Sequence, residues 1–594
     1  MGFLPLIPLL AFAIITLSLA ARGISYRRSL LISALSCGLL VAVSTEVLSL
    51  FHALSFFPIV SLWLTATGLA FCYFRTWQWK VRIPKIRIRV SAATLCITVV
   101  ASATFLIAIV SPPNTWDSMT YHMSRVMHWI QNGTVAHYPT GIPRQLYSAP
   151  WAEYTILHLQ LLSGGDRFAN LVQWGAMGGS LIGISLIAQE MGARPYMQAA
   201  SAAFAATLPM GILQASSTQN DFVVSFWLVS FIYFGLVMQR EWSLVNAMAV
   251  GCSLGLAMLT KATAAIVALP FMFWFLMGTF NRNGLRRFGY LGVIAFFMLI
   301  LNSGHFQRNS ALWGNPLATG TDRVTNEQIS LSATLSNLSR NLVSNTWTPV
   351  EKLNLLMYGE VQILHDFLGI DINDPRTSVN NTRFEPAMTS YNEDYAGNCL
   401  HTIVFLCVLI CLLPNLLKRP RPLHLQYALS VAASCLLFSM LLKWQPWITR
   451  LQLPLFITAA PLISSIIPSG QMKWLTEVCL GFLLICSLPW LLQNQTRPLL
   501  GGWTILNTER ELLYFASNPG ITNYYFARAD IIQRHGVCFD IGVTGSVDAY
   551  EYPLWVLLGN RLTHRPRIEH ILVDNVSSSI PHSEFTPCAV VKLL

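Results

Sequence analysis

Long apolar runs separated by short polar segments cover most of this 594-residue chain. A helix that crosses a bilayer needs about twenty mostly apolar residues, because each residue advances ~1.5 Å through an apolar core ~30 Å thick. Runs of this kind recur about fourteen times. The pattern predicts an all-α polytopic membrane protein with spans near residues 2–20, 30–52, 57–74, 91–111, 167–189, 196–215, 221–238, 243–260, 262–279, 288–304, 398–417, 423–443, 453–468 and 474–493.

The composition supports a membrane chain. Apolar residues make up 54% and charged residues only 11%, whereas soluble domains carry about 25% charged residues. The first apolar run lacks the basic segment that opens a secretory signal, so it is interpreted as a membrane helix. The twelve cysteines show no spacing typical of a metal site.

The basic residues orient the predicted spans. With fourteen spans, every short basic loop falls on one side, as the positive-inside rule requires, and both termini lie outside. The net charge of +11 is thus explained by topology, and no nucleic-acid partner is expected. These loops contain Arg22, Arg27 and Arg28, the stretch from Arg75 to Arg89, Arg194, Arg240, Arg282, Arg286 and Arg287, the stretch from Lys418 to Arg421, and Lys473.

Three hydrophilic stretches remain, all on the outer side: residues 112–166, 304–398 and 495–594. Within the last, residues 537–543, 568–574 and 589–593 have the composition of strands, and residues 552–558 fit a helix or a further strand. The tail is therefore predicted to be a small α/β domain. Its Cys538 and Cys588 either form a disulfide or share one domain by chance.

Five ionisable residues stand at the predicted outer ends of spans. Charged groups beside apolar segments are costly and tend to mark functional sites. Two carboxylates and three cations at one interface would place a base beside an anionic leaving group. These residues are Asp117, Asp221, Lys261, Arg308 and Arg450.

Each candidate also has a structural interpretation. Asp221 would cap a helix N-terminus. Lys261 and Arg450 would reach the lipid headgroups, although both break the positive-inside bias, and Arg308 would lie on the surface. Glu153 is either a second acid of the first outer loop or an ordinary helix-start residue.

Three histidines of the first outer loop, His122, His128 and His137, suggest a metal at first sight. Their spacings of six and nine residues put no two of them on one helical turn, so separate loop contacts are expected instead. Glu46 lies inside the second span and is expected to contact a neighbouring hydroxyl or backbone group.

Together these features resemble the GT-C glycosyltransferases, especially the protein O-mannosyltransferase and lipid A aminoarabinose transferase group. Asp117 with the following Met-Thr-Tyr-His-Met-Ser-Arg is similar to the acidic start of that group's first outer loop. Residues 255–261, Gly-Leu-Ala-Met-Leu-Thr-Lys, are similar to its Gly-Leu-x-x-Leu-Thr-Lys segment, and residues 308–316 to its Arg-Asn-x-x-x-x-Gly-Asn-Pro stretch. The chain departs from the group at Asp117-Ser118, where the family has two acidic residues, so the resemblance leaves a divalent metal cofactor open.

The resemblance spans about residues 91–470 and implies a division of the chain. Residues 1–90 would add three N-terminal membrane helices to a GT-C-like module at 91–304, with its first outer loop at 112–166. A large outer loop at 305–397, C-terminal membrane helices at 398–493 and the extracytoplasmic domain at 494–594 would follow.

The implied reaction transfers a sugar, with inversion, from a polyprenyl-phosphate donor to a glycan, lipid or protein. Asp117 would be the base, with Asp221 or Glu153 stabilising the oxocarbenium-like sugar. Lys261, Arg308 and Arg450 would bind the donor phosphate. Substrate contacts are assigned to Tyr121, His122 and Arg125.

The expected location is a bacterial inner membrane, with the site facing the periplasm or exterior. A transporter or flippase of a lipid-linked saccharide is an alternative, but it is expected to show inverted repeats and midplane charges. An O-antigen polymerase or ligase is a second alternative, and a membrane scaffold without activity a third.

Overall fold

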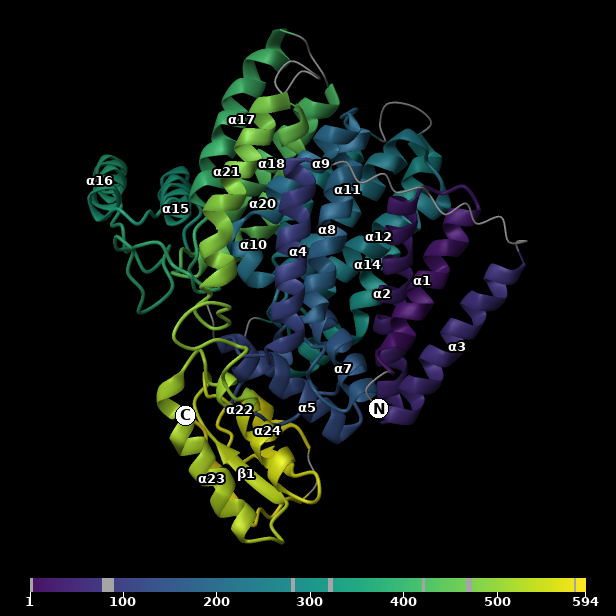
Figure 1. The fold of residues 1–594 in the computed structure, drawn as a ribbon, viewed down its shortest axis with the longest axis vertical. Helices are drawn as coiled ribbons and strands as arrows, with labels where there is room; N and C mark the ends of the chain where they lie inside the picture. Colours follow the sequence, from purple (N-terminus) through teal and green to yellow (C-terminus); the bar gives the residue numbers. More distant parts are fainter. Residues whose placement is uncertain are drawn as a thin grey trace.

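The computed structural model describes residues 4–76, 90–278, 284–318, 324–418, 422–465, 473–581 and 584–594. An α-helical bundle carries a small sheet-containing domain at one end (Figure 1), which confirms the predicted fold class. Both chain termini and the helices of the first outer loop lie toward that end. Most of the basic stretch after Arg75, together with Arg282 and residues 419–421, lies outside the described residues.

The apolar runs fold as helices. Eight described helices are long and apolar enough to span a membrane, and four apolar helices are shorter. The eight are α2 (Tyr26–Leu50), α3 (Phe56–Arg75), α4 (Ala92–Val110), α8 (Leu171–Glu190), α11 (Asp221–Arg240), α14 (Gly284–Trp313), α18 (Pro422–Leu441) and α21 (Lys473–Leu492). The shorter ones are α1 (Leu6–Ala21), α12 (Leu244–Thr260), α13 (Ala264–Met277) and the segment Cys399–Leu412 of α17 (Cys399–Lys418).

Two expected spans are interrupted. The segment 196–215 consists of α9 (Pro195–Ala206) and α10 (Pro209–Gln214), because Pro209 disfavours helical backbone at the residue before it. The segment 453–468 begins as α20 (Leu453–Ala459) and continues as the 3-10 turn η2 (Ala460–Ser465); residues 466–468 lie outside the described residues.

Helix α11 forms the centre of the bundle. Every residue from Asp221 to Met238 is buried, and α11 packs against α8 and α12. A helix that is apolar on all sides is stable in such a position because neighbouring helices cover its whole circumference. The polar N-terminus of α11 is thereby fixed inside the protein.

Glycines allow α12 to lie close to α14. A Cβ at Gly251 would lie 2.8 Å from the Ile294 Cα, and one at Gly255 would lie 3.1 Å from the Phe297 carbonyl oxygen. Asn302 of α14 donates to the Gly255 carbonyl at 3.0 Å. Small residues four apart permit such close contact between membrane helices.

The hydrophilic stretches also contain helices. After α4, the π-helical turn η1 (Ser118–His122) leads into α5 (Met123–Asn132), α6 (Arg144–Tyr147) and α7 (Trp151–Ser163). The second stretch forms α15 (Leu331–Ser344) and α16 (Glu351–Leu368), and α19 (Ile448–Leu451) follows α18.

The tail contains a three-stranded parallel sheet in the order β2-β1-β3. The strands are β1 (Asp540–Thr544), β2 (Arg567–His570) and β3 (Ala589–Lys592), and residues 552–558 belong to helix α24 (Tyr552–Arg561). Helices α22 (Arg510–Leu513) and α23 (Thr522–Arg534) and the 3-10 turns η3 (Pro519–Ile521) and η4 (Val576–Ser579) complete it. Cys538 and Cys588 form a disulfide.

The tail packs on the first outer loop. One apolar core includes Met119, Met123 and Trp129 of the loop together with Tyr552 and Trp555 of the tail. Polar contacts fix the register of this interface. Gln131 donates to the Ile568 carbonyl at 3.1 Å and accepts from the Ile568 N–H at 2.9 Å, so it pairs with the edge strand β2 as a neighbouring strand would.

Gly251→Ala tests the contact between α12 and α14. The added methyl group meets backbone of α14, so we expect the substitution to lower stability by about 1–3 kcal/mol. Gly292→Ala is the matched control, because a Cβ at Gly292 meets nothing within 4 Å and alanine favours the helix. The unfolding midpoints of both variants are measured by thermal unfolding in detergent. Equal midpoints would contradict the close contact between α12 and α14.

Candidate active site

A single guanidinium joins three carboxylates near the end of the bundle that carries the tail. Arg450 Nη2 lies 2.9 Å from Asp117 Oδ2, Nη1 lies 2.5 Å from Asp394 Oδ1, and Nε lies 3.7 Å from Asp221 Oδ2. Arg450 is 9% exposed and Asp221 1%. Because these charges are largely removed from water, their mutual interactions are strong.

Two further cations complete the group. Lys261 Nζ donates to Asp221 Oδ1 at 2.6 Å, and Arg144 Nη1 lies 3.6 Å from Asp117 Oδ1. We call these six residues, Asp117, Asp221, Asp394, Lys261, Arg144 and Arg450, the Arg450 cluster. Its three positive and three negative groups balance, which reduces the cost of burying each one.

The ends of helices position these side chains. Asp117 immediately precedes η1, and Asp221 is the first residue of α11. Lys261 follows the last residue of α12 with an extended backbone, which ends that helix. Arg450 lies on α19, between α18 and α20. Four of the five ionisable residues expected at the outer face are therefore brought together.

Arg308 lies outside the Arg450 cluster and forms an ion pair with Glu46. Its guanidinium donates to both carboxylate oxygens of Glu46 at 2.7 and 2.8 Å and to the Tyr154 hydroxyl at 2.9 Å. Glu46 was expected to contact a hydroxyl, and Tyr154 supplies one, but the sequence did not indicate Arg308 as its ion-pair partner. Among the described residues, no ion pair joins Arg308 to the Arg450 cluster.

Glu153 belongs to a second buried group. Its Oε1 contacts His122 Nδ1 and lies 2.6 Å from Arg125 Nη2, and its side chain is fully buried. Arg125 also donates to the carbonyl oxygens of Ser148 and Ala149. Burial acts to raise the pKa of Glu153, but Arg125 and His122 lower it on balance. Tyr121, the third expected substrate residue, places its ring 5.2 Å from the Arg144 guanidinium carbon.

The carboxylates that share Arg450 differ in proton affinity. Burial would raise the pKa of Asp117, but Arg450 and Arg144 outweigh it and hold that pKa at about 2. For Asp394, burial dominates over Arg450 and raises the pKa to about 6. A carboxylate with a pKa near the working pH is the more effective proton acceptor.

Sequence reasoning missed Asp394 and Arg144. Asp394 lies in Tyr-Asn-Glu-Asp-Tyr just before α17, so the criterion that selected Asp117, an ionisable residue beside a span, would also have selected it. Arg144 lies well inside the first outer loop and away from any span, so this criterion does not select it. No local signal distinguishes it.

A cavity of about 1280 Å³ lies between the first outer loop and the tail. Histidines at positions 52, 128, 137 and 570 line it, but no member of the Arg450 cluster does. Of the three histidines of the loop, His122 contacts Glu153 within the loop, whereas His128 contacts Glu551 of the tail, which the sequence did not indicate. Burial lowers the pKa of His137 to about 3, so this ring is neutral.

Residues 149–305 match the family model of dolichyl-phosphate-mannose-protein mannosyltransferase. The match runs from the start of α7 into α14 and supports the resemblance to GT-C glycosyltransferases for this part of the chain. It contains Asp221 and Lys261, but not Asp117, Arg308 or Arg450. With the apolar helices described above, it supports an integral membrane glycosyltransferase.

Two crystal structures of ArnT from Cupriavidus metallidurans align with the chain at 13% sequence identity. The TM-score is 0.44 for the structure bound to undecaprenyl phosphate and 0.45 for the apo structure. Each alignment covers 82% of this chain and 86% of that chain. No curated protein matches the chain at a significant level.

The pKa of Asp394 predicts a pH dependence of stability. Because its folded-state pKa of about 6 exceeds the unfolded value of about 3.9, the folded state binds the proton more tightly. Stability should therefore fall as pH rises from about 4 to 6, by up to about 3 kcal/mol, and Asp394→Asn should remove this fall. Unfolding midpoints between pH 4 and 7.5 measure it, with Asp530→Asn on the exposed face of α23 as control. An unchanged profile in Asp394→Asn would contradict the assignment.

Proposed function

We propose that this chain transfers a sugar from a polyprenyl-phosphate donor to a glycan, lipid or protein acceptor, with inversion, on the extracytoplasmic face of a bacterial inner membrane. The observation that carries the proposal is the Arg450 cluster, which brings cations and carboxylates together at one end of the helical bundle. The matched family model, whose name specifies a dolichyl-phosphate mannose donor, supports the donor class.

The cations of the cluster suit the leaving phosphate. Cleavage of the sugar–phosphate bond leaves negative charge on the departing oxygen, and fixed cations stabilise that charge most in the transition state. Lys261 and Arg450 are the proposed phosphate ligands. Lys261 is 19% exposed, and Arg450 presents a planar fork that fits two phosphate oxygens. A site at the membrane edge also leaves the apolar tail of the donor in lipid.

Asp117 is the proposed base. In the structure its pKa of about 2 reflects Arg450 and Arg144, which disfavours proton transfer to it. A donor phosphate that takes over Arg450 removes part of this stabilisation and raises the proton affinity of Asp117. Donor binding thus activates the base, and the acceptor hydroxyl is deprotonated only when the donor is present.

The other candidates receive supporting roles. Asp221, held by Lys261, provides negative charge beside the oxocarbenium-like sugar. Glu153, which lies outside the Arg450 cluster, orients His122 and Arg125. His122, Arg125 and Tyr121 are the proposed substrate contacts. Arg308 remains a candidate phosphate ligand only if donor binding releases it from Glu46. Residues 305–397 and the tail are proposed to shape the acceptor site.

No metal is proposed within the Arg450 cluster. A divalent cation needs free carboxylate oxygens, and the three carboxylates of the cluster already face Arg450, with Lys261 on Asp221 and Arg144 near Asp117. Protein cations therefore supply the charge that a metal would bring.

Asp117→Asn tests the base. Purified protein is given a panel of polyprenyl-phosphate sugars with candidate acceptors, and released polyprenyl phosphate is measured. We expect wild-type turnover and a loss of about 10²–10⁴-fold in Asp117→Asn, with donor binding retained. Asp530→Asn, an ion-paired but exposed aspartate, is the control. Normal turnover by Asp117→Asn would exclude Asp117 as the base and favour Asp394. If no donor of the panel is consumed, the result would favour a transporter.

Lys261→Met tests phosphate binding. The substitution keeps an unbranched side chain but removes the charge, so we expect weaker donor binding and slower turnover, by about 10²-fold or more. Lys261→Arg should restore part of both because the charge returns. Binding is measured with donor and with polyprenyl phosphate alone. If Lys261→Met binds both as tightly as wild type does, Lys261 only neutralises Asp221.

A further inference from the structure

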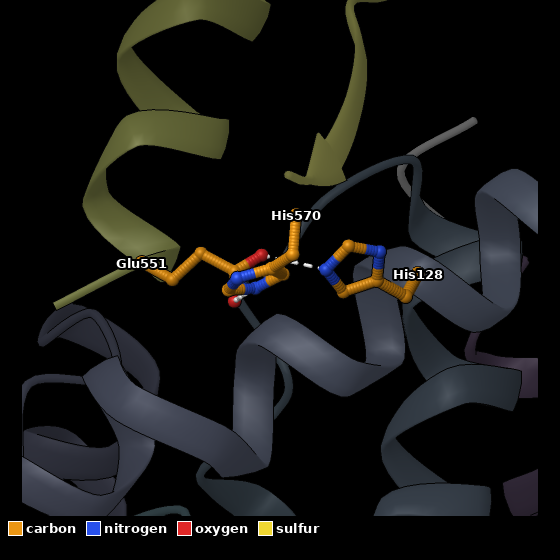
Figure 2. Close-up of side chains that lie close together, drawn as sticks. All are labelled: His128, Glu551 and His570. Atoms are coloured by element: carbon orange, nitrogen blue, oxygen red, sulfur yellow. Dashed lines mark hydrogen bonds and ion pairs between the residues drawn. The ribbon is translucent and has the colours of Figure 1, made fainter. Parts of the chain in front are cut away.

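A second polar site lies where the tail meets the first outer loop. His128 of α5, Glu551 just before α24 and His570 at the end of β2 converge there, and Figure 2 shows both rings directed at the Glu551 carboxylate. One ligand atom from each residue lies within 4.8 Å of the other two. All three side chains are buried, with Glu551 and His128 exposed by 0% and 2%.

We propose that His128, Glu551 and His570 bind a divalent transition-metal cation, with Zn²⁺ as the best match, at the junction of the tail and the first outer loop. Two imidazole nitrogens and one carboxylate oxygen are a donor set that Zn²⁺ prefers, whereas Mg²⁺ and Ca²⁺ prefer oxygen ligands. The site is separate from the Arg450 cluster and independent of the donor chemistry.

Binding of a cation requires only a small separation of the ligand atoms. His128 Nε2 lies 2.7 Å from Glu551 Oε1, and His570 Nε2 lies 3.1 Å from Glu551 Oε2. In a tetrahedral zinc site with metal–ligand distances of ~2.0–2.2 Å, neighbouring ligand atoms lie roughly 3.3 Å apart. The present atoms lie closer because hydrogen bonds join them, and a cation would replace these bonds.

Neighbouring groups hold the carboxylate in place. Gln145 Nε2 donates to Glu551 Oε2 at 2.5 Å, and Trp555 Nε1 donates to Oε1 at 2.9 Å. The Glu551 N–H also donates to the Met119 carbonyl at 3.1 Å. Such outer contacts are typical of metal sites, where they fix the orientation of the ligands.

The cavity supplies an entry path and an open coordination position. His128 and His570 both line the 1280 Å³ cavity, whereas Glu551 does not. A metal ion bound by these three ligands would present its remaining position toward the cavity. Water or a ligand oxygen there would complete the tetrahedron.

One hydrogen bond must change when the cation binds. The Gly141 N–H donates to His570 Nδ1 at 3.2 Å, so Nε2 carries the ring proton in this arrangement. Coordination through Nε2 moves that proton to Nδ1 and displaces the Gly141 amide. The loop that contains Gly141 should therefore shift slightly on metal binding.

Metal content of the purified full chain tests the site. Protein stripped with EDTA and reloaded with ZnCl₂ is desalted and analysed by mass spectrometry for zinc. We expect one equivalent of Zn²⁺ in wild type, and loss of it in Glu551→Gln and His570→Ala. His564→Ala, an exposed histidine of the same domain, is the control and should keep the metal. Reloading with Co²⁺ should give the strong visible absorption of a tetrahedral site.

A second measurement uses only folded protein. Zn²⁺ that binds the native state raises the unfolding midpoint as its concentration rises, so the midpoint of wild type should increase with ZnCl₂ and fall with EDTA. Glu551→Gln should not respond. If wild type retains no zinc and has the same midpoint in ZnCl₂ and EDTA, the proposal is overturned, and the triad is a hydrogen-bonded contact alone.

Discussion

The Arg450 guanidinium binds carboxylates from three parts of the chain that are far apart in sequence: Asp117 after α4, Asp221 at the start of α11, and Asp394 before α17. Each carboxylate is largely buried, so none is stable as an anion without a cation beside it. Removal of one partner from such a group usually costs more than the pair contributes, because an unpaired buried charge remains. The ends of these helices that meet at Arg450 are therefore held in one arrangement.

The same contact sets the chemistry of the site. A shared cation makes the proton affinities of Asp117 and Asp394 depend on each other, and the structure shows one pKa lowered and the other raised. Any anion that competes for Arg450 changes this balance. A phosphate-linked substrate would thereby alter the basicity of the carboxylates that it meets, so binding and reactivity are linked through one side chain.

The tail is packed against the rest of the chain rather than being an appended module. It shares an apolar core with the first outer loop, and its Asp548 contacts Arg144 of the Arg450 cluster. Glu551 and His570 meet His128 at the same interface. Movement of the tail would therefore disturb both the cavity beside it and one cation of the cluster.

The sequence alone determined the membrane class, the approximate spans, the tail strands and four members of the Arg450 cluster. These follow from local properties: apolar length, strand composition, and the cost of charge beside an apolar run. Tertiary structure alone decided which charges meet. Arg308 pairs with Glu46, Asp394 joins Arg450, and His128 finds partners more than four hundred residues away. Ion-pair partners depend on how helices pack and how the tail docks, and that information is not contained in any local segment.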